Sequence, residues 1–502
     1  MTTHLRRYKQ TIVVVSTLAI WQVVSLDVGE QSRVPSPVAI LTSIIAARHE
    51  YVPHILSTVF SASEGLLWGL LAACFLAALI QLFPILELFY VPSTLLFSIP
   101  LIVLVPIIGM TLDPNLTPAV CAALLVYYPV LVLINAGLQN VPRELFSYAT
   151  STGTGRLSIL LKLRARFALP GFAAGLQVAI PAALLGSMLG EFTGVRWGLG
   201  AYLLAIMAQA NPAKEWALFF TIATLASVST WISSQVWKRL GVSVAPISLV
   251  TARTRLPNGS LIVGVLLSIL LWEGASVWMA NPFFVKGPVE LWRYTVRYIS
   301  ANGSSVFSAL AVTLQWVAIG LIVGLAAGFV FAITIHLLPL LRGPLLGVAF
   351  ITQAVPIVAL IPLCIALFGR GPAATMAITI SATFFLCFSA VYQGLEATPD
   401  ALINFGISAG ASHLSILWHF RIPAAIPFLF AAARVTTPRV FLGVTLAEYL
   451  ATRQGLGALL FEARGTLDFG LMWLIACCAG AVSMLFAGGI AYLEQRALSR
   501  YL

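Results

Sequence analysis

The stretch 406-GISAGASHLSILWHFRIPAAIP-427 has an earlier counterpart, 149-ATSTGTGRLSILLKLRARFALP-170, at a constant separation of 257 residues. Both interrupt an otherwise apolar chain with serines, basic residues and a glycine. Extending the alignment to residues 142–200 and 399–457 needs no gap and gives 22 identities in 59 positions. Because self-similarity at a fixed period marks a duplicated structural unit, we expect two halves with the same fold.

The composition places this duplicated unit in a membrane. The 502 residues are 60% hydrophobic and only 9% charged, and the mean hydropathy is +0.98. A soluble domain is about a quarter charged, so these charges cannot cover a water-facing surface. Twelve apolar runs have about the length that a spanning helix needs, and they are too uniformly apolar for strands of a barrel. They are residues 11–27, 57–81, 90–111, 117–139, 171–190, 214–237, 260–280, 307–336, 345–369, 373–397, 428–447 and 470–493. We therefore expect an all-α polytopic membrane protein.

The net charge of +11 reflects membrane topology rather than nucleic-acid binding. Basic residues precede the first run and follow the fourth, the sixth and the last, which all fall on one side of the membrane. The positive-inside rule makes that side cytoplasmic, with both termini there. The first run reads as an uncleaved span rather than a signal peptide. The six cysteines and the scattered histidines show no metal-ligand spacing, so no metal site is expected.

Six spans in each half give both halves the same orientation, which predicts a parallel repeat with its pseudo-two-fold axis along the membrane normal. The expected organisation is a first half over residues 1–240, a cytoplasmic linker over 241–258 and a second half over 259–502.

The polar segments 141–170 and 398–427 predict a helix–glycine–helix elbow on the cytoplasmic side of each half. Gly410 is placed to end the first helix in a left-handed conformation, and Ser412 to cap a second helix that runs toward Arg421 and ends near Pro423. Gly153 occupies the equivalent place in the first half. One face of the first helix is apolar, and its members in the second half are Leu402, Phe405, Gly406 and Ala409. An apolar face outside the lipid favours partner docking over a plain solvated loop.

These segments resemble the EAA coupling loop of bacterial ABC importer permeases. Gly410 and Pro423 keep that pattern, and 354-AVPIVALIPLCIALFG-369 and 447-AEYLATRQGLG-457 are similar to permeases of the nitrate, sulfonate and taurine type, which include thiamine-precursor transporters. The resemblance covers residues 35–240 and 286–497. It implies a type I-like permease fold in a bacterial cytoplasmic membrane. It also implies two cytoplasmic ABC ATPase subunits, one at each elbow, and an extracytoplasmic binding protein that delivers the substrate.

No phosphate-binding Gly-x-x-x-x-Gly-Lys-Ser/Thr motif occurs in the sequence, so ATP and Mg²⁺ are expected on the separate ATPase chains. The sequence also departs from the family pattern. The Glu-Ala-Ala triplet is replaced by Ser147-Tyr148-Ala149 and by Asn404-Phe405-Gly406, and Arg166 stands where the first copy should have its proline. We expect Tyr148 and Phe405 to supply apolar contact in place of the missing glutamates. The ATPase-coupling set carried over from the resemblance comprises these two triplets together with Gly153, Arg164, Gly410, Arg421 and Pro423.

Three ionisable residues within spans are candidates for the substrate pathway, because such residues are costly in a membrane. The repeat-related Glu191 and Glu448 close the fifth span of each half. They either pair structurally with Arg196 and Arg453 or contact the substrate or the binding protein. Arg439 has no counterpart in the first half, where Ala182 stands. It either pairs with a carboxylate such as Glu64 or Glu273 or meets an anionic substrate.

Two other function classes are weaker. An ion-coupled secondary transporter with twelve spans needs coupling carboxylates, and the candidates Glu64 and Glu273 have no repeat partners. It also gives no reason for two matched elbows. A membrane enzyme needs a clustered set of catalytic residues, and the sequence offers none. The identity of the substrate does not follow from the sequence.

Overall fold

The computed structural model describes residues 33–209, 211–242, 260–279, 281, 283–338, 355–452 and 454–498, together with 16, 19–23 and 25. Most of the predicted first span, most of the linker and residues 345–354 therefore lie outside the described residues. Within the described ranges every regular element is a helix, which confirms the all-α prediction.

The helices follow the same order in the two halves. The first half contains α2 (Pro37–Ala46), α3 (Arg48–Leu82), η1 (Pro84–Phe89), α4 (Tyr90–Ser98), α5 (Leu101–Thr111), α6 (Thr117–Gln139), α7 (Arg143–Ser151), α8 (Arg156–Ser158), η2 (Ile159–Arg164), α9 (Ala165–Gly190), η3 (Glu191–Thr193), α10 (Leu199–Gln209) and α11 (Pro212–Arg239). The second half contains α12 (Ser260–Met279), α13 (Pro288–Leu337), α15 (Ile357–Phe368), α16 (Pro372–Glu396), α17 (Asp400–Ser408), α18 (His413–Ile416), η4 (Leu417–Arg421), α19 (Ile422–Ala451), α20 (Leu456–Gly465) and α21 (Phe469–Leu498).

The described residues include nine helices that are long and apolar enough to cross a membrane, or ten if one bent pair counts as a single span. The run predicted to span over 90–111 corresponds to this bent pair, because α4 and α5 meet there at 94°. Pro100 causes the break. The residue before a proline is pushed out of the helical region, and Ile99 accordingly has ψ 124°.

Each half is built around three neighbouring helices, which are α3, α6 and α9 in the first half and α13, α16 and α19 in the second. The two halves share one buried apolar cluster, to which α5 contributes Leu101–Val105 and α15 contributes Val358 and Ile361. A polar contact also crosses between the halves, where the Arg464 guanidinium donates to the Phe192 carbonyl at 3.0 Å.

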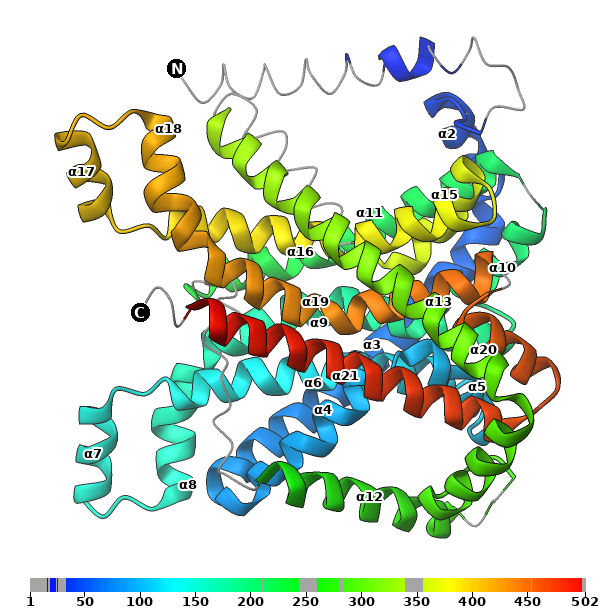
Figure 1. Cartoon of the computed structure of the whole chain (residues 1–502), viewed down its shortest axis with the longest axis horizontal. Helices are drawn as coiled ribbons and strands as arrows, with labels where there is room; N and C mark the ends of the chain where they lie inside the picture. Colours follow the sequence, from blue (N-terminus) through cyan, green and yellow to red (C-terminus); the bar gives the residue numbers. More distant parts are fainter. Residues whose placement is uncertain are drawn as a thin grey trace.

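The arrangement agrees with a parallel repeat. Figure 1 shows α7 with α8 and α17 with α18 projecting from the same end of the molecule, while α10 and α20 lie toward the opposite end. Inverted repeats would have placed the two projecting units at opposite ends. The exact limits predicted for the two halves and the linker stay a prediction.

Candidate functional site: two elbows and two buried glutamates

Each elbow turns at a glycine with a left-handed backbone. Gly153 has φ +71° and Gly410 has φ +77°, and each follows directly after the C-terminal end of α7 or α17. This is the conformation that a residue with a Cβ rarely adopts. The predicted cap is also present, because the Ser412 hydroxyl accepts a hydrogen bond from the Ser415 N–H at 3.2 Å. Both features confirm the local prediction from the sequence.

The second arm of the elbow does not end near Pro423, contrary to the prediction. It continues through a π-helical turn at Leu417–Arg421 directly into α19. The first half shows the same continuity through the π-helical turn Ile159–Arg164, although Arg166 replaces the proline there. Proline has no N–H to donate. The π-helical turn spaces its hydrogen bonds more widely than an α-helix, so Pro423 follows this turn without ending the helix. Each elbow is therefore joined rigidly to the fifth span of its half.

The outer faces of α7 and α17 present large apolar side chains to the surroundings. Tyr148 is 71% exposed and Phe405 is 66% exposed. Gly406, in contrast, is buried, and a Cβ added there would lie 3.2 Å from the Phe420 ring of the second arm. Tyr148 and Phe405, the middle residues of the two replaced triplets, thus face outward. Gly406, the last residue of the second triplet, allows the two arms of the second elbow to pack closely. The first positions, Ser147 and Asn404, are also exposed.

The repeat-related arginines fasten the elbows to the spanning helices. The Arg164 guanidinium donates to the Gln81 side chain of α3 and lies 4.9 Å from the centre of the Phe146 ring. The Arg421 guanidinium donates to the Leu395 carbonyl at the end of α16, at 3.2 Å. These contacts give both arginines a role inside the chain, so they hold the elbow in place rather than reaching out from it.

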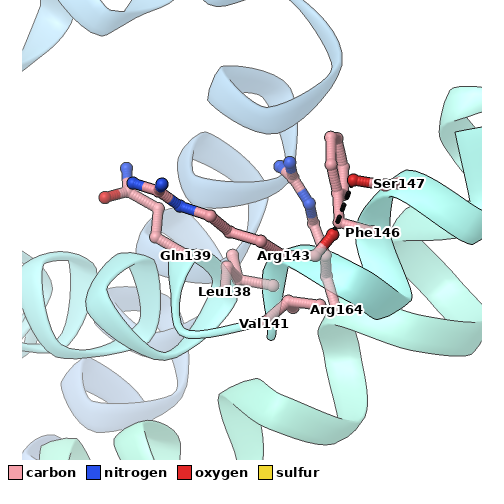
Figure 2. A pocket seen from close by; sticks show the side chains of 7 residues that line it. All are labelled: Leu138, Gln139, Val141, Arg143, Phe146, Ser147 and Arg164. Carbon is pink, nitrogen blue, oxygen red and sulfur yellow. Dashed lines mark hydrogen bonds between the residues drawn. The ribbon is translucent and has the colours of Figure 1, made fainter.

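A cavity of about 290 Å³ opens where the first elbow meets α6. Figure 2 shows the Arg143 side chain running beside Gln139, and the Arg164 side chain running beside the Phe146 ring. The Ser147 hydroxyl, on the same wall, donates to the Arg143 carbonyl at 2.8 Å. Two guanidinium groups and two neutral polar side chains therefore line this space, and no acidic side chain lines it.

The glutamates Glu191 and Glu448 lie near the opposite end and form matching networks. Each is only 1% exposed. Glu191 accepts hydrogen bonds from the Thr58 hydroxyl at 2.7 Å, the Ser187 hydroxyl at 3.2 Å and the Gly200 N–H at 2.6 Å. Glu448 accepts from the Thr313 hydroxyl at 2.9 Å and from the Gly457 N–H at 3.0 Å.

The two threonines complete the networks from the second span of each half. The Thr58 oxygen accepts from the Leu199 N–H at 2.7 Å, and the Thr313 oxygen accepts from the Leu456 N–H at 2.9 Å. A buried carboxylate is thereby satisfied by hydroxyls and backbone amides. Each network ties the start of α10 or α20 to two spanning helices. The glutamates consequently have structural partners, but not the predicted ones.

The predicted partner Arg196 is exposed, and its guanidinium lies 5.2 Å from the centre of the Trp197 ring; Arg453 lies outside the described residues. The repeated Arg-x-Gly-Leu-Gly motif serves the glutamates through its glycines instead. Gly198 and Gly455 have φ +150° and +88°, and a Cβ at either would collide with the carboxylate. Thr58 and Thr313 were not predicted from the sequence. Their separation of 255 residues, close to the repeat distance, is the signal that points to them.

The Arg439 side chain is exposed, although Thr436, Thr437 and Val440 beside it in α19 are buried. It shares one face of α19 with Leu442 and Leu446, one and two turns further on, and both leucines are buried in the cluster that the two halves share. Neither Glu64 nor Glu273 pairs with it, and no other described residue does. Arg434, by contrast, pairs with Glu494 at 3.4 Å.

Comparison with known families identifies the repeated unit. The family described as "binding-protein-dependent transport system inner membrane component" matches residues 65–240 and again residues 320–499. The chain belongs to this family. Both matches include an elbow and its buried glutamate, so the duplication seen in the sequence is a duplication of the whole permease unit.

Individual relatives are about half as long as this chain. A probable ABC transporter permease protein of Haemophilus influenzae is 26% identical over 49% of this chain and 98% of its own length. The formylaminopyrimidine transport permease protein ThiX of Halalkalibacterium halodurans is 23% identical over 38% of this chain and 76% of its own length. The taurine transport system permease protein TauC of Escherichia coli is 23% identical over 47% of this chain and 86% of its own length.

These findings establish the class of the protein. It is a multi-pass membrane protein and a permease subunit of an ABC transporter, with two permease units in one chain. It is a transport subunit rather than an enzyme, as its relatives are. The family in general works with ATPase and binding-protein partners.

Proposed function

We propose that this chain forms the whole membrane pathway of an ABC importer in a bacterial cytoplasmic membrane. A small substrate enters from an extracytoplasmic binding protein and crosses between the two halves. Each elbow docks on one cytoplasmic ATPase subunit. ATP and Mg²⁺ bind to those subunits, and both termini of the permease lie on their side of the membrane.

The observation that carries this proposal is the pair of rigid, projecting elbows at one end of the molecule. Tyr148 and Phe405 expose large apolar surfaces there, on helices that the positive-inside rule places on the cytoplasmic side. Apolar surface of this kind marks a protein interface. Because the π-helical turn joins each elbow to the fifth span without a break, a displacement of the elbow is transmitted to α9 or α19.

Arg439 supports an anionic substrate within this proposal. An exposed guanidinium at the interface of the two halves, with no carboxylate partner among the described residues, is open to an oxyanion. Sulfonates, carboxylates and phosphates have the planar or tripodal oxygen groups that a guanidinium binds best. The buried carboxylates of Glu191 and Glu448 already accept hydrogen bonds from within the chain. We therefore assign them to positioning α10 and α20 rather than to substrate contact.

Uptake by vesicles that contain the purified chain tests the proposal. Vesicles with the chain, its ATPase subunits and its binding protein are expected to accumulate substrate only when ATP is supplied on the ATPase side. Taurine, formylaminopyrimidine and riboflavin form the first panel, because relatives are named for their transport. ATP hydrolysis by the same vesicles is measured in parallel. Uptake driven by an ion gradient without the ATPase would instead establish a secondary transporter.

A further inference from the structure

The two elbows differ in charge far more than in shape. Residues 141–170 contain five Arg and Lys residues and one Glu, whereas residues 398–427 contain one Arg and one Asp, which gives net charges of +4 and zero. The largest single difference lies at the cavity of the first elbow. At the same offset of 257 residues, Arg143 corresponds to Asp400 and Gln139 corresponds to Glu396.

Arg143 is not placed for the stability of its own helix. It is the first residue of α7, where the positive end of the helix dipole disfavours a cation. Asp400, the first residue of α17, has the charge that the dipole favours. The second elbow therefore has a local explanation for its charged residue, and the first elbow does not.

The positive charge at the first cavity is not paired with a carboxylate in the described part of the chain. No side chain caps the start of α7, so N–H groups of its first turn are free to add to the positive potential. Two guanidinium groups, those of Arg143 and Arg164, line this space, and the free N–H groups at the start of α7 add to its positive potential.

We propose that this cavity binds a carboxylate side chain of the ATPase subunit that docks on the first elbow. This inference rests on the proposed function and adds the chemistry of that contact. A permease that has lost its own glutamate here presents a cation in its place, so the ion pair across the interface is reversed, with the acidic partner on the ATPase. The second elbow, with Asp400 in place of Arg143, takes its ATPase through apolar contact, which makes the two docking surfaces chemically different.

Charge reversal on the full-length chain tests the proposal. Arg143→Glu is compared with Arg166→Glu, which makes the same change of charge on the same elbow at an exposed residue that does not line the cavity. Binding of the ATPase subunits to the purified chain in lipid nanodiscs is measured at low and high salt. We expect Arg143→Glu to weaken binding by about tenfold, to remove most of its salt dependence, and to leave the melting temperature of the chain unchanged. Arg166→Glu is expected to bind within about twofold of the unchanged chain.

A second variant identifies the partner group. Acidic residues on the permease-facing surface of the ATPase are changed to lysine one at a time, and one such change is expected to restore binding to Arg143→Glu. Equal binding by Arg143→Glu, Arg166→Glu and the unchanged chain would overturn the inference while leaving the proposed function intact. An effect of Arg143→Glu that occurs only in phosphatidylglycerol nanodiscs, and not in phosphatidylcholine, would overturn it in favour of a lipid headgroup. Failure of the unchanged chain to bind any ATPase would instead refute the proposed function.

Discussion

A threonine and a glutamate hold the same loop in each half, but the two networks are not equally complete. Glu191 has three hydrogen-bond donors, including the Ser187 hydroxyl, while Val444 stands at the position equivalent to Ser187 beside Glu448. Thr313→Val should therefore leave Glu448 with the Gly457 N–H alone and orphan the Leu456 N–H. An unsatisfied buried polar group costs about 1–3 kcal/mol, so we expect a clear loss of thermal stability.

Thr58→Val should cost less, because Glu191 keeps two of its three donors. Thr230→Val is the matched control, since that hydroxyl donates to the Ala226 carbonyl of its own helix at 2.8 Å. Melting temperatures of the purified variants in detergent measure the order. A loss at Thr230 equal to the losses at Thr58 and Thr313 would show that the networks do not hold the loops. A loss at Thr58 as large as that at Thr313 would show that the third donor to Glu191 gives no additional stability.

Arg439 allows a direct test of the interior of the molecule. After replacement of the six cysteines, Arg439→Cys is expected to react with a water-soluble thiol reagent, because the Arg439 side chain is exposed. Thr436→Cys, almost one turn earlier in α19 and fully buried, is expected to stay unmodified. Reaction rates measured by mass spectrometry compare the two. Protection of Arg439→Cys equal to that of Thr436→Cys would place Arg439 away from any aqueous pathway.

At the scale of single residues, the sequence identified the important ionisable side chains more reliably than it identified their hydrogen-bond partners. The repeat singled out Glu191 and Glu448, and both are buried at equivalent places. It suggested arginine partners because a charge in a membrane calls for an opposite charge. The structure satisfies the carboxylates with hydroxyls and amides instead. The two threonines among these partners lie more than 130 residues away in the sequence, and no local pattern in the sequence reveals them.

At the scale of elements, the elbow is where the chain meets its ATPases. Tyr148→Ala combined with Phe405→Ala removes the largest exposed side chains from α7 and α17. Since aromatic anchors carry much of the energy of an interface, with single truncations costing about 2 kcal/mol or more, we expect ATPase binding to fall by at least tenfold without a change in expression. Phe60→Ala, an equally exposed aromatic side chain on the spanning helix α3, is the control in the same binding measurement. Binding that survives the double change would mean that other surfaces dock the ATPases.

The turn and the helix cap of the elbow could be predicted from the sequence, but the continuation of its second arm into α19 could not. Gly410 and Ser412 act through their own backbone and nearest neighbours, which the sequence shows directly. Whether Pro423 ends a helix depends on the turn before it, and the π-helical turn at Leu417–Arg421 carries the helix past it. The bend within the run 90–111 was also not predicted. There Pro100 does break the helix, although the apolar run continues without interruption.

At the scale of the whole molecule, the duplication predicted two halves of one orientation, and the two projecting elbows at one end agree with it. The way in which the halves join was not predictable. The shared apolar cluster takes residues from α5 and α15, and the Arg464–Phe192 contact joins positions 272 residues apart. A hydropathy profile does not distinguish the apolar residues of this cluster from apolar residues that face lipid. The interface between the halves is therefore visible only in the three-dimensional packing.

The stoichiometry of the complex tests the central claim most directly. One chain of 53.7 kDa with two elbows is expected to carry two ATPase subunits, where relatives of half its length would supply one elbow each. Native mass spectrometry of the complex released from nanodiscs gives the count. The account predicts one permease chain with two ATPase subunits, falling to free permease in the Tyr148→Ala, Phe405→Ala double variant. A complex of two permease chains with two ATPase subunits, or a chain that carries none, would contradict it.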